Sequence, residues 1–240
     1  MRRSPLPGVD LGVYVRAVPL LLRNPSIGVV PLLMAVVAVL IGQLTSPYGG
    51  GMLTVATGGI GALIALLLQM FGLGTACIIA DDAWRHGRAS FDRGWEDARR
   101  RTPDILMASI GFTLLLGVAQ YVGALLNLGL IALGLAAVVF FFLIWTLPAA
   151  AVGGIPGGAA IQVSIERVRS SPMSAAAVAV VSVAVVLLLY VFVPVALDEM
   201  LFPYVPLTPI TMALIAALFH AIAIAYIAAV ITKTYTDRAF

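Results

Sequence analysis

Long stretches without a charged residue divide this chain. No Asp, Glu, Lys or Arg occurs within residues 24–80, 105–165, 170–197 or 200–232. A helix needs about 20 predominantly apolar residues to cross about 30 Å of hydrocarbon. The two longer stretches therefore have room for two crossings each and the two shorter ones for one crossing each, which predicts six transmembrane helices.

Turn residues split the two longer stretches. The sequence Ser-Pro-Tyr-Gly-Gly-Gly at 46–51 cannot continue a helix, and Asn-Leu-Gly at 127–129 is the best division of the second stretch. Apolar segments in lipid must satisfy their own backbone hydrogen bonds, so each span is expected to be helical. The predicted fold is an all-α integral membrane bundle, one domain over 1–240, with spans at 26–44, 55–80, 105–126, 129–152, 173–196 and 210–231.

The composition agrees with this interpretation. The chain is 62% hydrophobic and only 10% charged, whereas a soluble globular domain carries about 25% charged residues. Cys77 is the single cysteine, so it can form neither an internal disulfide nor a cysteine-based metal site by itself. Basic residues interleaved with aromatic ones do not form a block, so no nucleic-acid partner is expected.

The cations predict the orientation. Six crossings place both chain ends on one side, together with the segments 81–104 and 153–172. Loops that carry Lys and Arg face the cytoplasm, so both termini are expected to be cytoplasmic and to lie near anionic lipid headgroups. The predicted cytoplasmic side holds all 14 basic residues: Arg2, Arg3, Arg16, Arg23, Arg85, Arg88, Arg93, Arg99, Arg100, Arg101, Arg167, Arg169, Lys233 and Arg238.

Three stretches share one order of features. A short mixed apolar and charged segment is followed by Arg, by Asn, Thr or Ser, and by Pro25, Pro103 or Pro172, before a span begins. The polar residue can cap the helix and proline is tolerated at its first position. Any cytoplasmic entry to a membrane helix favours these same residues, which is the alternative to a repeat. We predict three parallel units, each a short interfacial helix and a two-helix hairpin: 9–80, 89–152 and 159–231.

Four parts of the sequence carry a family resemblance: Leu22-Arg23-Asn24-Pro25 with Pro31, the segment Asp81–Asp104, Ile165-Glu166-Arg167 and Ala225-Tyr226-Ile227. With them the layout resembles uncharacterised six-helix bacterial inner-membrane families, one of which is the membrane domain fused to some glycerophosphodiester phosphodiesterases. The resemblance covers most of the chain. It implies a bacterial inner-membrane location, and it brings no catalytic residues, because the phosphodiester chemistry belongs to a separate soluble domain.

The segment 81–104 is the only charge-dense stretch. Its acidic pair Asp81-Asp82 is similar to pairs that bind Mg²⁺ and phosphate in membrane-bound transferases. The mixed charges favour instead a solvated helix with i,i+4 ion pairs, which would act as an anchor and docking segment. Its tryptophans are typical of interfacial anchors. The candidate residues are Asp81, Asp82, Trp84, Arg85, Trp95, Arg99, Arg100 and Arg101.

His220 is the only ionisable residue deep within a predicted span. It could bind a haem or chlorin or carry a proton, because ionisable groups inside membranes are functional candidates. It could equally pack and form a hydrogen bond with Gln69, Gln120 or a backbone carbonyl. The same span carries Ala217, Ala221 and Ala225 within a stripe of alanines at four-residue steps, which predicts close helix contact inside the chain or with a second subunit.

The sequence shows no paired acid, base or metal ligands in the spans, so no enzyme activity, cofactor or metal is expected. The leading functional hypothesis is a non-enzymatic scaffold or accessory subunit that contacts a membrane-protein partner or a second copy through helix packing and the segment 81–104. The alternative is a transporter or lipid-handling protein with an apolar cavity.

Overall fold

A computed structural model describes residues 9–45, 52–125, 129–201 and 208–237. Among them every regular element is helical, and six helices are long and apolar enough to cross a membrane. The predicted six-helix, all-α membrane fold is therefore confirmed. The elements are α1 (Gly12–Arg23), α2 (Ser26–Thr45), α3 (Met52–His86), α4 (Phe91–Arg100), α5 (Thr102–Leu125), α6 (Gly129–Leu143), α7 (Thr146–Ala151), α8 (Gly157–Ser170), α9 (Pro172–Val186), the π-helical segment η1 (Leu187–Phe192), α10 (Val193–Leu201) and α11 (Pro209–Thr236).

Short helices precede the first, third and fifth spans, as expected. They are α1, α4 and α8, and each is followed by a span that begins within three residues. The expected capping by the polar residue of each unit is wrong. The Asn24 amide donates to Leu20 O, the Thr102 hydroxyl donates to Ala98 O, and Ser171 makes no side-chain cap. Whether the three units are an internal repeat stays a prediction.

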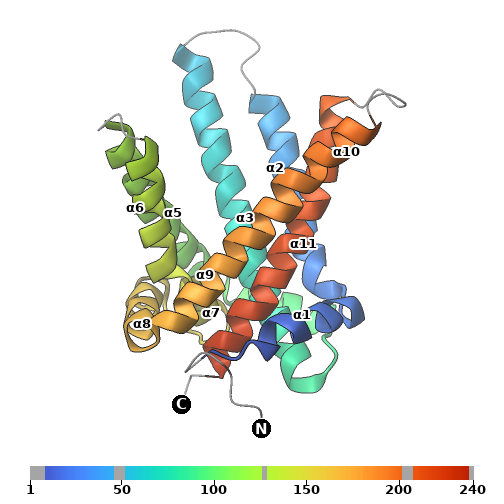
Figure 1. Cartoon of the computed structure of the whole chain (residues 1–240), viewed down its shortest axis with the longest axis vertical. Helices are drawn as coiled ribbons and strands as arrows, with labels where there is room; N and C mark the ends of the chain where they lie inside the picture. The colour runs from blue at the N-terminus through green and yellow to red at the C-terminus, as the bar shows by residue number, and fades with distance from the viewer. Residues whose placement is uncertain (1–8, 46–51, 126–128, 202–207, 238–240) are drawn as a thin grey trace.

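The helices pack together at one end of the molecule and diverge toward the other (Figure 1). We call the packed end the base; it contains α1, α4, α8 and the C-terminal end of α11. Every Lys and Arg that the structure describes lies on these elements or next to them, while Asp198 and Glu199 lie in α10 at the opposite end. Helices α2, α3 and α11 pack against one another. The α5–α6 hairpin contacts α3 near the base and stands apart from these three helices toward the other end (Figure 1).

Small residues permit the close contacts at the base. A Cβ atom built on Gly94 of α4 would lie 2.5 Å from Ile79 of α3, and one on Gly74 would lie 2.6 Å from Ile105 of α5. Each isoleucine therefore fills the space that the missing side chain leaves. This is how helices associate in lipid, where the surrounding chains are as apolar as the core and close packing supplies the stabilisation.

Two prolines coincide with departures from the regular α-helix. The predicted span 129–152 is interrupted at Ile144 and Trp145, and Ile144 is the residue whose carbonyl the ring of Pro148 would meet in a continuous helix. At this break the hydroxyl of Ser164 satisfies two backbone groups, because it accepts a hydrogen bond from Trp145 N and donates one to Phe142 O. Pro194 lies two residues after the end of the π-helical segment, whereas α2 runs through Pro31 without interruption.

Candidate functional site: an apolar cavity beside His220

The spans enclose an apolar cavity of about 320 Å³ between the α5–α6 hairpin and helices α3, α9 and α11. Of the described residues that line it, only Ser182 and His220 have polar side chains. The lining residues are Met70, Leu73, Phe112, Leu116, Phe140, Leu143, Ile144, Leu147, Ser182, Val183, Val186, Leu187, His220, Ile224, Ile227 and Ile231.

The lining residues of the cavity are buried toward the base, at Leu147 and Ile231, and partly exposed along α9. Next to its lining residues Leu147 and Ile231, the indole N–H of Trp145 donates to the Thr234 hydroxyl at 3.2 Å, and Trp145 is fully buried. On the α9 side, Val183 and Leu187 line the cavity while nearly half of each side chain is exposed. The lining is therefore more exposed along α9 than toward the base.

His220 separates this cavity from a second one of about 280 Å³. Small residues of α2 and α11 line much of the second cavity, and Gln43, Gln69 and Tyr190 add polar groups. The Tyr190 and His220 rings meet edge to face, with their centroids 4.8 Å apart. The histidine is thus in contact with both cavities.

Both ring nitrogens of His220 are buried, and neither has a hydrogen-bond partner among the described residues. Gln69 lines the same cavity but forms no hydrogen bond with the imidazole, and the side chain of Gln120 lies outside the described residues. Among the described residues, therefore, neither Gln69 nor a backbone carbonyl supplies the hydrogen bond that the packing alternative requires. A buried donor or acceptor without a partner costs about 1–3 kcal/mol.

The π-helical segment η1 positions Tyr190. The N–H of Val193 donates to Leu188 O, a bond across five residues, because Pro194 has no N–H and its ring excludes the carbonyl one α-turn earlier. The wider turn changes the direction in which the side chains after it leave the helix. Leu187 lines the first cavity and Tyr190 lines the second. Such π-bulges are frequent at functional sites.

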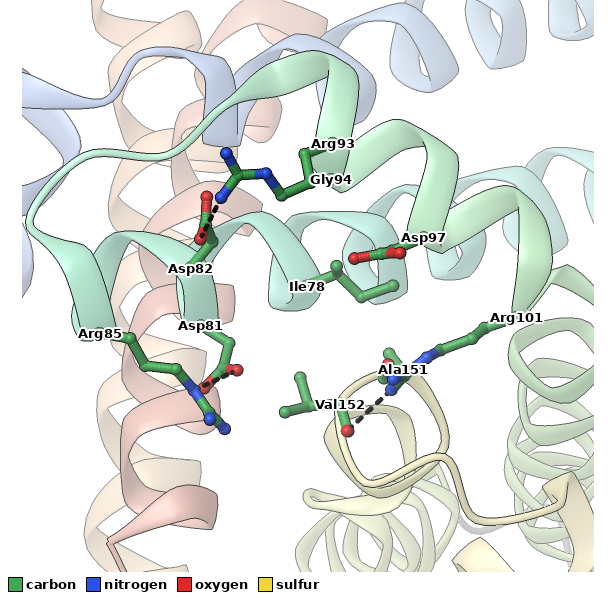
Figure 2. Close-up of a pocket in the computed structure, with 10 residues that line it drawn as sticks. All are labelled: Ile78, Asp81, Asp82, Arg85, Arg93, Gly94, Asp97, Arg101, Ala151 and Val152. Carbon is green, nitrogen blue, oxygen red and sulfur yellow. Dashed lines mark hydrogen bonds and ion pairs between the residues drawn. The ribbon is translucent and has the colours of Figure 1, made fainter.

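The charge-dense segment 81–104 is not one solvated loop. Helix α3 continues to His86, the chain turns at Gly87 with φ 76°, and α4 folds back along α3. Figure 2 shows the polar cavity of about 230 Å³ that results. Asp81 pairs with Arg85 and Asp82 with His86, both at 2.8 Å and both at i,i+4 spacing.

No group of three His, Cys, Asp or Glu residues that could hold a metal ion occurs in the described part of the chain. In the polar cavity arginines accompany the carboxylates: Arg93 approaches Asp82 to 3.9 Å, and the Arg101 side chain reaches toward Ala151 and Val152 (Figure 2). Within the described residues, therefore, the acidic pair belongs to ion pairs.

Two of the predicted anchor residues join separate elements. The indole N–H of Trp84 donates to Ala229 O in α11 at 2.9 Å. Arg101 donates to Ala151 O at 2.6 Å and to Val152 O at 2.8 Å, at the end of α7. These carbonyls end a helix and have no partner within it, so the guanidinium group satisfies them.

The other predicted anchors stay near the surface of α4. Trp95 stacks on Phe91 with centroids 6.4 Å apart, and Arg100 pairs with Glu96 at 2.5 Å. Arg99 is exposed. These residues could contact headgroups or a partner, whereas Trp84 and Arg101 stabilise the fold.

The alanine stripe packs inside the chain. Ala217, Ala221 and Ala225 are nearly fully buried, and a Cβ atom built on Gly28 of α2 would lie 3.8 Å from the Ala225 Cβ. Of the two alternatives that the sequence left open, the structure shows the internal contact.

Sequence reasoning missed the roles of three residues. Asn24 ties the α1–α2 joint to the turn after α3, since its amide donates to Gly87 O and accepts from Ala89 N. Trp145 donates to Thr234 of α11 from a fully buried position, and Tyr190 contacts His220. A tryptophan in the middle of an apolar span was an available signal for Trp145, while Asn24 and Tyr190 depend on contacts distant in sequence.

Comparison with protein-family models, with curated proteins and with solved structures finds no match for this chain. The resemblance to six-helix inner-membrane families stays a prediction, and the functional argument rests on the cavity and its lining.

Proposed function

We propose that this multi-pass membrane protein is a non-enzymatic lipid-handling protein, which binds the hydrocarbon part of a lipid in the apolar cavity. The observation that supports this proposal is the lining of the cavity, which consists of fourteen apolar side chains together with Ser182 and His220. Ligand pockets of about 300–1,000 Å³ with few polar groups are typical of small-molecule sites. The cavity of about 320 Å³ falls within this range.

The lining also favours a lipid over a polar solute. A sugar, amino acid or ion would lose its hydration on entering, and two polar side chains could replace little of it. A hydrocarbon chain leaves an equally apolar medium and gains contacts with the walls. Access past Val183 and Leu187, which are partly exposed to the bilayer, fits a ligand that arrives within the membrane.

We further propose that the base is cytoplasmic, in the inner membrane of a bacterium. Its arginines support this orientation through the positive-inside rule. Exposed cations such as Arg88, Arg99 and Arg169 would then face anionic headgroups, each contributing about 1 kcal/mol of attraction.

A scaffold or accessory role is the second candidate. The observation that favours it is the fifth span, Pro172–Met200, in which 11% of the most apolar window is buried, against 56% for Ile210–Thr236. A span with so little contact inside the chain offers a face to a membrane-protein partner or a second copy. The exposed side of α4 would provide a polar contact at the base.

A matched pair of tryptophan substitutions tests the lipid proposal. Leu116 lines the cavity and Leu114, on the same helix α5, is exposed to lipid. Leu116→Trp fills the cavity, so we expect a several-fold loss of co-purifying lipid in native mass spectrometry, while Leu114→Trp retains the wild-type amount. The thermal unfolding temperature of each variant in detergent reports whether it is folded.

Added lipid gives a second readout that does not depend on either variant. A ligand that binds the native state raises its stability by mass action, so the wild type is expected to unfold at a higher temperature with lipid than without. Equal lipid content in Leu116→Trp and Leu114→Trp would contradict binding in this cavity. A stoichiometric protein partner with no bound lipid would favour the scaffold candidate instead.

A further inference from the structure

The unsatisfied imidazole of His220 lies where the two cavities meet. Its ring nitrogens are buried without hydrogen-bond partners, although Gln69 and Tyr190 line the adjoining space. The surroundings on the other side are hydrocarbon side chains and Ser182, whose hydroxyl forms no hydrogen bond with the imidazole. A buried polar group without a hydrogen bond destabilises the empty protein. A ligand that supplies the missing hydrogen bond removes this cost, and the recovered free energy favours binding.

We propose that His220 binds the hydroxyl group of a neutral lipid alcohol whose hydrocarbon chain occupies the apolar cavity. This inference rests on the proposed lipid-handling function and names the class of lipid. The hydroxyl lies against His220, and the smaller cavity beside Gln69 and Tyr190 accommodates the rest of the polar end.

The depth of His220 excludes a charged headgroup. The residue lies ten positions after Ile210, the first residue of its membrane span, and ten helical residues cover about 15 Å. A phosphate drawn to that depth would lose its hydration without a cation to pair with, because the described residues that line the two cavities include no Lys or Arg. The polar end of the ligand is therefore uncharged.

The chemistry of imidazole selects a hydroxyl among uncharged groups. One nitrogen of a neutral imidazole donates and the other accepts. A carbonyl can pair only with the N–H, whereas a hydroxyl both donates and accepts and can pair with either nitrogen. Since both nitrogens lack partners here, an alcohol is the group that fits whichever nitrogen faces the ligand.

Diacylglycerols and polyprenols are two membrane sources of this chemistry. Both carry one free hydroxyl and no charge. The test therefore uses dioleoylglycerol and a polyprenol, together with controls that keep the chains but block the hydroxyl: the methyl ether of dioleoylglycerol and the polyprenyl methyl ether. Binding to the purified protein in detergent is measured by native mass spectrometry and by the shift in unfolding temperature.

We expect the wild type to bind at least one alcohol about tenfold more tightly than its control, as one hydrogen bond to a buried partner allows. His220→Phe keeps the ring shape and removes both nitrogens, so this preference should fall to within about twofold while hydrocarbon binding persists. His220→Gln restores a donor and an acceptor and should recover part of the preference. The alcohol that is preferred over its control, dioleoylglycerol or the polyprenol, identifies the class of lipid that the protein binds.

The stability of the empty protein separates recognition from packing. Because the imidazole nitrogens have no partners in the structure, His220→Phe should unfold at the same temperature as the wild type or above it. A marked drop would reveal a structural hydrogen bond and overturn the inference. A visible absorption band in the wild type that His220→Phe removes would overturn it as well, in favour of a bound pigment.

Failure of this inference is distinguishable from failure of the proposed function. If the alcohols and their controls bind the wild type equally, and Leu116→Trp abolishes both, the cavity binds lipid but His220 does not select a hydroxyl. If no probe binds the wild type, the lipid-handling function fails together with the inference.

Discussion

At the scale of single residues, neighbouring side chains of one type have different roles. Arg99, Arg100 and Arg101 form one basic run in the sequence, and all three were predicted as anchors. In the structure Arg99 is exposed and Arg100 pairs locally with Glu96, whereas Arg101 donates to two carbonyls of a helix end some fifty residues away. Only the last interaction joins separate parts of the fold.

Replacing Arg101 should therefore destabilise the protein more than replacing Arg99. Hydrogen bonds to charged groups contribute about 1.5–3 kcal/mol, and Arg101→Met also leaves the carbonyls of Ala151 and Val152 without this donor. We expect Arg101→Met to lower the free energy of unfolding by about 2–3 kcal/mol and Arg99→Met to change it by less than about 0.5 kcal/mol. Equal effects in detergent unfolding would show that the Arg101 contacts are not stabilising.

At the scale of elements, proline has three outcomes in similar apolar helices. Pro31 lies within an uninterrupted α2, Pro148 follows the break between α6 and α7, and Pro194 follows a π-helical turn. The chemical cause is shared, since proline lacks an N–H and crowds the carbonyl four residues earlier. What differs is the surrounding structure, such as Ser164, which satisfies the broken turn before Pro148.

The π-helical turn should depend on Pro194. With Pro194→Ala the segment can return to α-helical hydrogen bonding, which removes the extra residue of the wide turn. Tyr190 then rotates around the helix by part of a turn relative to His220, and the ring contact at 4.8 Å weakens. Nuclear magnetic resonance cross-peaks between labelled tyrosine and histidine rings measure this contact, and the chain has only 2 histidines to assign.

Pro31→Ala is the matched control, because Pro31 lies within α2 without interrupting the helix. It should leave the Tyr190–His220 cross-peak unchanged. A cross-peak of wild-type intensity in Pro194→Ala would mean that packing against α11, and not proline, determines the π-helical turn.

At the scale of the whole molecule, the separation of charge along the bundle determines a testable orientation. The described cations lie at the base, and Glu199 lies in α10 at the other end. In a Cys77→Ser background, Glu199→Cys should react with an impermeant thiol reagent in intact cells, and Ser170→Cys at the base should react only after the membrane is opened. Labelling of Ser170→Cys in intact cells would reverse the orientation or change the number of crossings.

The sequence by itself determined the number of crossings, the span boundaries to within a few residues in most cases, and the local ion pairs at the end of α3. These features depend on residues that are close together in the sequence. The fixed thickness of the hydrocarbon layer sets the length of an apolar run, and i,i+4 spacing on a helix brings Asp81 to Arg85. The continuation of α3 to His86 was missed, because charged residues were taken to mark the end of the helix.

Only the tertiary structure decided where the cavities lie and which side chains they leave without partners. The contact of Tyr190 with His220, the bond from Trp84 to Ala229 and the hydrogen bonds of Arg101 each join residues thirty to about 145 positions apart. Hydropathy specifies that a helix crosses the bilayer but not which face meets which neighbour. In lipid both faces are apolar, so close packing and a few hydrogen bonds select the arrangement.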